Sequence, residues 1–393
     1  MKATFRSGEL VKMMRDLVRV VPSKSDNPAL LHVLIQADKE QARVDMIASR
    51  ETMSVRRTLF EDATDSPVTI EQSGTCFLPA KELFEIVKKA EGATVTLSEG
   101  KQKRTQIVFG KTKFELANLD PVLFTPYSEA EENTTSVVLM APALHRLIRR
   151  TSYAVAKTEV RPTLTGVNLR LTDSTLRGDA TDALRLATYT VTCKSVAGDD
   201  RSLVVPGVLL DKLALSLPSS DDDEEVTLTM GENSITVAWD DDSIRVVMRA
   251  LEGTYPDTDR IIPRSMPHKV TVERQALLEA CDRVSVLSVE DHQQSTVIVL
   301  ADKITISADS AQYGKAADEV AVTTSQLKVE SIRYWFNINY WLSALRSMDD
   351  VEQVDLQMLG MNQPIVMTPI GGPGLILLSP MRQAESGGTT QAG

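Results

Sequence analysis

The 393-residue sequence predicts an α+β protein of three tandem domains, each made of two strand–helix–three-strand repeats. Two observations predict this fold class. A strand-like opening followed by an amphipathic helix recurs six times, and successive openings lie 62 to 72 residues apart. After each helix, apolar and polar residues alternate, which is the pattern of half-buried strands. Two such repeats make roughly 130 residues, an ordinary domain size.

The six openings are short runs rich in β-branched, aromatic and other apolar residues. They begin at residues 2, 74, 136, 202, 268 and 334. The helices expected after them cover residues 7–24, 80–90, 141–157, 206–217, 272–288 and 337–348.

Both periodicities can be read directly from the repeats. Residues 226–230 and 234–239 alternate apolar and polar side chains around a turn at 231–233, so they predict two strands. A helix is predicted in the first repeat, because apolar residues there recur three and four positions apart. These residues are Leu10, Met13, Met14, Leu17 and Val18.

The repeats place the domain boundaries near Asn133 and Pro267. The expected domains are residues 1–133, 134–267 and 268–382. The remaining tail, 383–393, is rich in Gly, Ser, Thr and Gln and is expected to be disordered. The alternative is an α+β protein whose segments resemble one another only by chance.

The composition indicates a protein of the reducing cytoplasm. No apolar run approaches the ~20 residues that a membrane span needs, and the N-terminus lacks the apolar segment of a signal peptide. Cys76, Cys193 and Cys281 are scattered, so they form neither a disulfide framework nor a paired metal motif. We expect a cytoplasmic protein that does not bind membranes.

The net charge of −11 argues at first against a nucleic-acid partner. The charge is unevenly distributed, however: the expected helices carry +7, which leaves −18 for the rest of the chain. If the helices line a central hole, their positive charge offsets the repulsion of DNA phosphates. The basic residues expected to face DNA are Lys12, Arg15, Arg19, Lys24, Lys81, Arg146, Arg149, Arg150 and Lys157.

Several longer motifs identify a family. Residues 160–167 read Val-Arg-Pro-Thr-Leu-Thr-Gly-Val, and residues 180–187 read Ala-Thr-Asp-Ala-Leu-Arg-Leu-Ala. Further motifs lie at 251–257, 260–263, 283–288, 336–340 and 377–382, with a weaker one at 27–30. Together they resemble the bacterial DNA-polymerase sliding clamps, the DNA polymerase III beta subunit family, over residues 1–382.

The resemblance implies a fold and a mode of action. Three clamp-type (processivity fold) domains per chain would form a ring as a head-to-tail homodimer, with twelve helices facing encircled double-stranded DNA. Members of the family catalyse nothing and need no cofactor; ATP is used by a separate clamp loader. The implied partners are the DNA polymerase III catalytic subunit, other polymerases, the clamp loader and repair proteins.

The resemblance also implies a partner pocket between the second and third domains. In the family it accepts a short linear motif that carries Gln and hydrophobic residues. Ala183 and Leu184 depart from the family's more usual Gly and polar or aromatic residue, so the peptide preference is expected to differ. The matching positions are Arg161, Thr181, Ala183, Leu184, Arg185, Leu186, Pro256, Arg260, Ile261, Asn337, Tyr340, Asn362, Pro364, Leu377, Leu378, Pro380, Met381 and Arg382.

A search of the sequence for catalytic motifs finds none. The four histidines, His32, His145, His268 and His292, lack metal-ligand spacing. The Gly-rich segment 371–374 is expected to form a turn, and the acidic run 221–225 a solvated loop. Two rival functions stay open. One is an enzyme on an α+β scaffold, and the other is a divergent clamp homologue that sequesters partners as a decoy.

Overall fold

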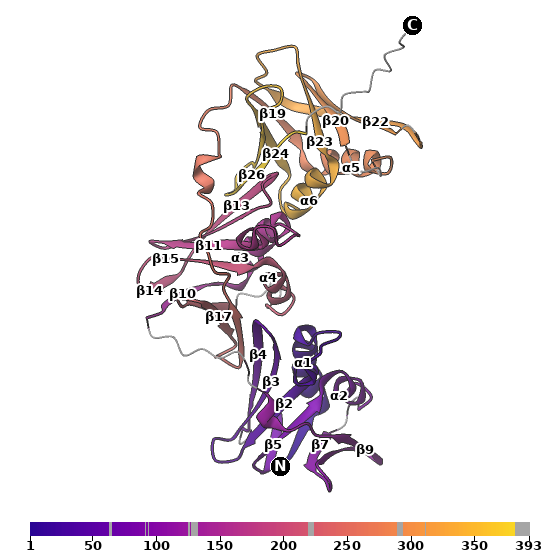
Figure 1. Ribbon diagram of the computed structural model, residues 1–393, viewed down its shortest axis with the longest axis vertical. Coiled ribbons are helices and arrows are strands. Elements are labelled where there is room, and N and C mark those ends of the chain that lie inside the picture. The colour runs from indigo at the N-terminus through magenta and orange to yellow at the C-terminus, as the bar shows by residue number, and fades with distance from the viewer. Residues whose placement is uncertain are drawn as a thin grey trace. The chain divides into compact units, whose positions relative to one another are not determined.

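The computed structural model describes residues 1–62, 65–90, 92, 94–124, 126, 133–218, 224–288, 294–310 and 312–381 (Figure 1). The chain forms two compact units. Unit 1 comprises Met1–His145, Leu171–Ser174 and Thr192–Glu252. Unit 2 comprises Arg146–Arg170, Thr175–Val191 and Gly253–Gly393. Each unit contains part of the second expected domain. The domain boundaries near Asn133 and Pro267 therefore stay predictions.

All six repeats begin with the expected strand and helix, and three or four strands follow each helix. The first three strand–helix pairs are β1 (Lys2–Arg6) with α1 (Ser7–Val20), β6 (Gly74–Pro79) with α2 (Ala80–Val87), and β10 (Thr135–Met140) with α3 (Ala141–Thr151). The other three are β15 (Arg201–Pro206) with α4 (Gly207–Ala214), β19 (His268–Glu273) with α5 (Arg274–Ser285), and β23 (Ser331–Asn337) with α6 (Ile338–Ser347).

All six helices end earlier than the sequence analysis predicted, and the difference is largest for α1 and α3. Helix α1 stops at Val20, because Pro22 forces the preceding Val21 into an extended conformation with ψ 128°. Helix α3 stops at Thr151 and gives way to a short 3-10 turn, Ser152–Ala154. Lys24 and Lys157 therefore lie beyond the helices to which they were assigned.

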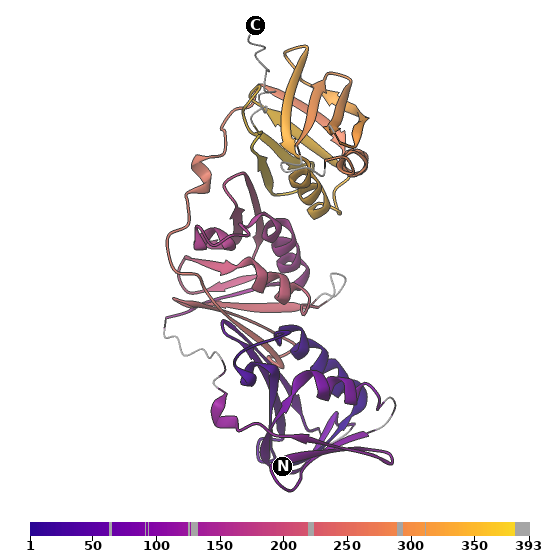
Figure 2. The ribbon, with the colours of Figure 1, turned by 45° about the vertical axis from the view of Figure 1, so that its right-hand side comes forward.

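Unit 1 contains two antiparallel sheets. The smaller has the order β5-β1-β7-β8-β9, and the larger has the order β14-β10-β16-β17-β18-β4-β3-β2-β6. Helices α1 and α2 pack against each other in this unit (Figure 2). The remaining strands are β2 (His32–Asp38), β3 (Arg43–Arg50), β4 (Met53–Phe60), β5 (Val68–Gln72), β7 (Thr94–Glu99), β8 (Arg104–Phe109), β9 (Thr112–Ala117), β14 (Ser195–Ala197), β16 (Glu225–Met230), β17 (Ser234–Trp239) and β18 (Ile244–Arg249).

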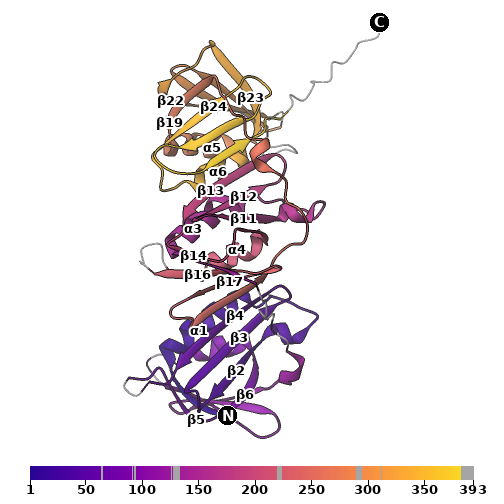
Figure 3. The ribbon, with the colours of Figure 1, turned by 90° about the vertical axis from the view of Figure 1, so that its left-hand side faces the viewer.

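The larger sheet joins the first and second domains without a break. Strand β18 pairs with β4 from Ile244 opposite Arg57 to Met248 opposite Met53. Strands β4, β3, β2 and β6 then continue the sheet side by side (Figure 3). Main-chain hydrogen bonds therefore hold this seam together, in addition to side-chain packing.

In unit 2 one sheet runs in the order β11-β12-β13-β26-β25-β24-β19-β22-β21-β20-β23. Strand β13 of the second domain pairs with β26 of the third, from Arg185 opposite Leu378 to Thr188 opposite Leu375. The strands not yet located are β11 (Gly166–Thr172), β12 (Thr175–Thr181), β13 (Arg185–Thr192), β20 (Gln294–Leu300), β21 (Lys303–Ser310), β22 (Gly314–Ser325), β24 (Gln353–Met358), β25 (Ile365–Pro369) and β26 (Leu375–Leu378).

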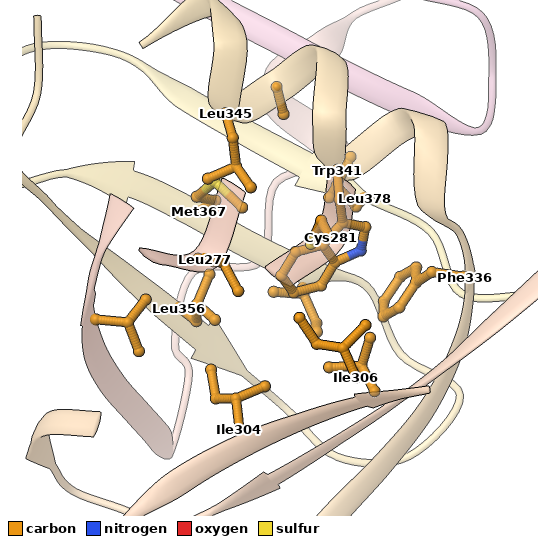
Figure 4. Close-up of a cluster of buried hydrophobic side chains, with 14 of the residues drawn as sticks. Leu277, Cys281, Ile304, Ile306, Phe336, Trp341, Leu345, Leu356, Met367 and Leu378 are labelled. Carbon is orange, nitrogen blue, oxygen red and sulfur yellow. The ribbon is translucent and has the colours of Figure 1, made fainter. Parts of the chain in front are cut away.

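The third domain has a continuous aliphatic core with few aromatic rings. Trp341 of α6 is fully buried, and its ring meets the ring of Phe336 edge-on at a centroid distance of 5.4 Å. Leu277 and Cys281 of α5 point into the same cluster (Figure 4). Cys281 is therefore a packing residue, as its helical neighbours predict.

Candidate partner-binding site

Unit 2 contains a hollow of about 720 Å³ beside the start of β13 and the helix α6. The residues that line it combine aromatic rings, short apolar side chains, amides and charged groups. This mixture complements a peptide better than it complements a purely apolar ligand. The lining residues are Tyr153, Ala156, Lys157, Thr158, Asp182, Leu184, Arg185, Asn337, Asn339, Tyr340, Leu342, Ser343 and Arg346.

The central residue of the hollow is Arg185. Its side chain is only 6% exposed and its guanidinium lies over the rings of Tyr340 and Tyr153, at 4.6 and 5.4 Å from their centroids. Its Nε donates to Asp182 at 2.9 Å, and its Nη1 donates to the hydroxyl of Ser343 at 2.8 Å. A planar cation that contacts two aromatic rings and binds a carboxylate is well oriented.

The turn before Arg185 is fixed by side-chain hydrogen bonds. The carboxylate of Asp182 accepts from the backbone N–H groups of Leu184 and Arg185, both at 3.0 Å. The hydroxyl of Thr181 accepts from the N–H of Ala183 at 3.1 Å and donates to the carbonyl of Arg185 at 2.6 Å. Ala183 has a φ of 74°, a conformation that favours Gly, so the Gly more usual in the family has a physical reason.

Burial also affects the pKa of the two tyrosine hydroxyls around the guanidinium. Burial raises the pKa of the Tyr340 hydroxyl, and it also raises the pKa of Tyr153. A tyrosine hydroxyl is already neutral at physiological pH, and the raised pKa keeps both phenols neutral further into the alkaline range. The hollow thus presents an oriented guanidinium and two neutral phenol rings.

Four of the residues predicted for the pocket line the hollow: Leu184, Arg185, Asn337 and Tyr340. Asn337 caps α6, because its side chain accepts from the N–H of Asn339. Leu186 and Leu377 lie elsewhere in unit 2, in a small buried cluster with Val366, against which Ile262 and Met266 pack. Leu378 belongs instead to the core of the third domain.

The segment between the second and third domains carries Pro256, Arg260 and Ile261, all exposed. Tyr255 ties this segment to the turn described above, since its hydroxyl accepts from the N–H of Thr181 at 3.0 Å. A second tie is the exposed carboxylate of Asp259, which pairs with Arg177 at 2.8 Å and Arg170 at 3.2 Å. These contacts hold the segment beside the turn that carries Arg185.

The other predicted pocket residues are spread over unit 2. Arg161 is exposed, as is Asn362, whereas Pro364 and Pro380 are half-buried. The N–H of half-buried Met381 donates to the carbonyl of Trp335 at 2.6 Å. Arg382 and the predicted disordered tail lie outside the described residues.

The residues predicted to face DNA divide into two groups. Lys12, Arg15 and Arg19 are exposed on α1, Lys81 on α2 and Arg146 on α3, and Lys24 is exposed after α1.

The other three depart from the prediction. Arg150 is only 5% exposed and pairs with Asp350 at 2.6 Å, so its guanidinium is not available to a phosphate. Arg149 is half-buried and pairs with both Asp349 and Asp350. Lys157 lies beyond α3, in the wall of the hollow.

Other kinds of site have little support. None of the helices in the described part of the chain combines the length and apolar character that a membrane span requires. Within the described ranges no three His, Cys, Asp or Glu side chains come together as a metal-binding group. His292 and the acidic residues 221–223 lie outside those ranges. The Gly-rich segment 371–374 is the turn between β25 and β26, as predicted.

Comparison with known proteins assigns the family. Models of the N-terminal, central and C-terminal domains of the DNA polymerase III beta subunit match residues 1–125, 139–257 and 259–378, in that order. The beta sliding clamp of Bacillus subtilis (strain 168) is 32% identical over 390 residues, which are 97% of this chain and 100% of that protein. The chain belongs to the DNA polymerase III beta subunit family.

Further relatives support this assignment. The beta sliding clamp of Staphylococcus aureus is 27% identical over 387 residues, covering 97% of this chain and 99% of that one. The crystal structure of the Bacillus subtilis DNA polymerase sliding clamp superposes with a TM-score of 0.90 at 29% identity, over 98% of this chain and 100% of that chain. The predicted resemblance and the three tandem clamp-type domains are confirmed.

The family motifs identified only some of the residues that line the hollow in this member of the beta subunit family. Tyr153, Asp182, Ser343 and Arg346 line it but were not predicted. Asp182 stands inside the quoted motif at 180–187, and its position before a turn was a usable signal. Ser343 and Arg346 could be placed only through the geometry of α6, which brings residues three and four positions apart to one face.

Proposed function

We propose that the chain is a DNA sliding clamp, a processivity factor that encircles double-stranded DNA and tethers replication and repair proteins to it. The observation that carries this proposal is the ordered match of all three beta subunit domains across the chain. Its mechanism is topological: enclosure keeps the protein on DNA, so contacts to individual phosphates can stay weak. The chain itself is proposed to catalyse nothing, to need no cofactor and to act in the cytoplasm.

The ring is proposed to close through two free strand edges. Strand β9 is the last strand of its sheet and is mostly exposed. Residues 314–321 of β22 pair with β21 on one side, while β22 pairs with β19 only from Val322 onward, so the other edge has no partner among the described strands. Pairing β9 of one copy with β22 of the next is head-to-tail, and two such contacts close a dimeric ring.

DNA contact is proposed for the exposed basic residues of the helices. Lys12 and Arg15 on α1 and Arg146 on α3 are the strongest candidates, because they are exposed and have no ion pair to the described residues within 4.0 Å. Contacts of this type are non-specific in sequence and weaken with salt. They suit a protein that slides along DNA.

The hollow around Arg185 and the cluster of Leu186, Val366 and Leu377 are proposed to bind the linear motif of partner proteins. Leu184 is 53% exposed at the hollow and offers apolar area to a peptide side chain. The proposed partners are the DNA polymerase III catalytic subunit, other polymerases, the clamp loader and repair proteins.

Solution mass and retention on DNA test the proposal together. Sedimentation velocity over a dilution series is expected to give a species of twice the 43.2 kDa chain mass. After loading, the protein is expected to stay on nicked circular DNA and to leave once the circle is linearised. A monomer at micromolar concentration that still binds motif peptides would refute the ring and support the decoy function.

A further inference from the structure

We propose that Asp179 and Asp259 are positioning residues for partner binding, because together they fasten the connector, residues 253–267, to strand β12. The connector joins the second domain to the third. Neither carboxylate is proposed to touch a partner peptide, and each acts through the segment that it holds. The inference rests on the proposed binding of partner peptides in unit 2.

Asp179 is a buried carboxylate that bridges the sheet and the connector. It lies on β12 and is 0% exposed. Its carboxylate accepts from the Nε of Arg177 at 2.7 Å and from the Nη2 of Arg170 at 3.5 Å. The side chain of Thr258, in the connector, also forms a hydrogen bond to it. A buried charge is tolerated where it is paired and hydrogen-bonded, so these contacts compensate the burial of Asp179.

The same two arginines reach on to Asp259 in the connector. Arg177 donates through Nη1 to the carboxylate of Asp259 at 2.8 Å, and Arg170 donates through Nη2 at 3.2 Å. The hydrogen bond from Arg177 lowers the pKa of Asp259, so this carboxylate stays ionised further into the acidic range. Each arginine therefore binds both carboxylates, and the four side chains form a closed network without net charge.

A second attachment lies two residues further along β12. The N–H of Thr181 donates to the hydroxyl of Tyr255 at 3.0 Å, so the connector is held at Tyr255 and again at Asp259. Just beyond these points, Ile262 and Met266 pack against the small buried cluster proposed to bind partner peptides. If the attachment at Asp259 is lost, a peptide must order the connector as it binds, and this entropy cost lowers the affinity.

Variants of Asp259 in the full-length protein provide the test, because its side chain is 51% exposed and can be changed without disturbing the core. The probe is a fluorescein-labelled peptide that carries one Gln and a Leu-Phe pair. Asp259→Asn is expected to weaken its binding about three- to tenfold, the effect of losing two partly solvated ion pairs, with little change in melting temperature. Asp259→Glu keeps the carboxylate and is expected to retain near wild-type affinity.

The matched control is Asp242→Asn. Asp242 is 44% exposed and also pairs with two arginines, Arg56 at 3.2 Å and Arg245 at 2.8 Å, but it lies in unit 1. The control removes the same charge and the same kind of ion pair, so it is expected to bind the peptide as the wild type does.

Limited trypsin digestion reports on the connector itself. Arg260 and Arg264 are exposed connector residues, and cleavage after them requires the segment to open locally. Asp259→Asn and Asp179→Asn are each expected to raise this cleavage rate severalfold and to weaken peptide binding. Adding Asp259→Asn to Asp179→Asn should lower the affinity by less than it does in the wild type, because the shared network is already weakened. An equal effect in both backgrounds would refute the network.

Failure of this inference can be told apart from failure of the proposed function. If the peptide binds the wild type and Asp259→Asn equally well, the positioning role is refuted and the partner site stands. Tighter binding by Asp259→Asn also refutes it, since the fastened connector would then obstruct the site. A loss of affinity that Asp242→Asn shares would attribute the effect to net charge and refute it too. No peptide binding by the wild type would refute both.

Discussion

The guanidinium carbon of Arg185 lies 4.6 Å from the centroid of the Tyr340 ring, which joins strand β13 of the second domain to helix α6 of the third. A hydrogen bond from the same guanidinium to Ser343 reinforces this link. The hollow is therefore organised in the free chain, which would lower the entropy cost of the peptide binding proposed for it.

Replacing Arg185 tests this arrangement. Arg185→Ala leaves Asp182 without its cation, so we expect the free energy of unfolding to fall by about 3 kcal/mol. Arg185→Lys keeps the charge but loses the planar stacking and the fork geometry, and it is expected to weaken peptide binding at least tenfold with a smaller stability loss. Thermal unfolding and fluorescence anisotropy measure the two effects. Wild-type behaviour of both variants would rule out the proposed role.

Leu184 and Leu186 are adjacent but should respond differently to truncation. Leu184 is 53% exposed and Leu186 is fully buried. Leu184→Ala is expected to weaken peptide binding severalfold with little change in melting temperature, whereas Leu186→Ala should cost about 2–5 kcal/mol of stability. Leu186→Ala combined with Met381→Ala is expected to abolish polymerase recruitment and leave the dimer intact. Polymerase binding by that double variant would contradict the assignment.

The basic face of α1 can be tested through salt dependence. Lys12→Gln with Arg15→Gln removes two exposed charges, and each lost phosphate contact should lower the slope of log K against log salt by about 0.9. Residence on nicked circular DNA is expected to shorten. Lys101→Gln, a change at an exposed turn residue outside the helices, is the control. An equal effect of the control would mean that net charge alone controls residence.

Replacing Gly374 with a larger residue is expected to destabilise the protein. Its φ is +105°, and a Cβ atom there would lie 2.9 Å from the Tyr189 ring and 3.0 Å from the carbonyl oxygen of Thr188. Gly374→Ala should therefore destabilise the protein by about 1–3 kcal/mol. Gly372→Ala is the matched control, because its Cβ would meet only Pro369 at 3.9 Å. Chemical denaturation of both variants measures the difference, and equal midpoints would disprove the expected clash.

Cys76 should make stability depend on alkaline pH. Burial raises its pKa from 9.0 to about 12, so the folded state holds the thiol proton more tightly than the unfolded state does. This contribution is fully present below pH 9.0 and is lost as pH rises toward about 12, by about 1.4 kcal/mol per pH unit. Urea unfolding of the wild type and Cys76→Ala at several alkaline pH values isolates the effect. Parallel pH profiles would contradict it.

Local pattern predicted most of the fold. The period of Leu10, Met13, Met14 and Leu17 located α1, because all four side chains are buried. The ends of all six helices were placed too late, by the most for α1 and α3. The signal of Pro22 was present in the sequence, but the change from α-helix to a 3-10 turn at Ser152 depends on packing that sequence periodicity does not encode.

The candidate site was less predictable than the fold. Motifs located Arg185 and Tyr340, yet Arg150 and Lys157 were assigned to DNA because charge counting along a helix ignores burial and helix length. Asp350, which neutralises Arg150, is 200 residues distant in sequence. Contacts over such separations follow from the tertiary fold, and a single sequence carries no direct sign of them.

The pairing of β18 with β4 also has a mechanical consequence. Five residue pairs, from Ile244 with Arg57 to Met248 with Met53, lie along this seam. A tensile load parallel to the strands acts on all of their hydrogen bonds in shear, so they must fail together rather than one at a time. If a clamp loader opens the proposed ring, the β18–β4 seam should stay paired. The proposed contact between β9 and β22 of neighbouring subunits should be the one that separates.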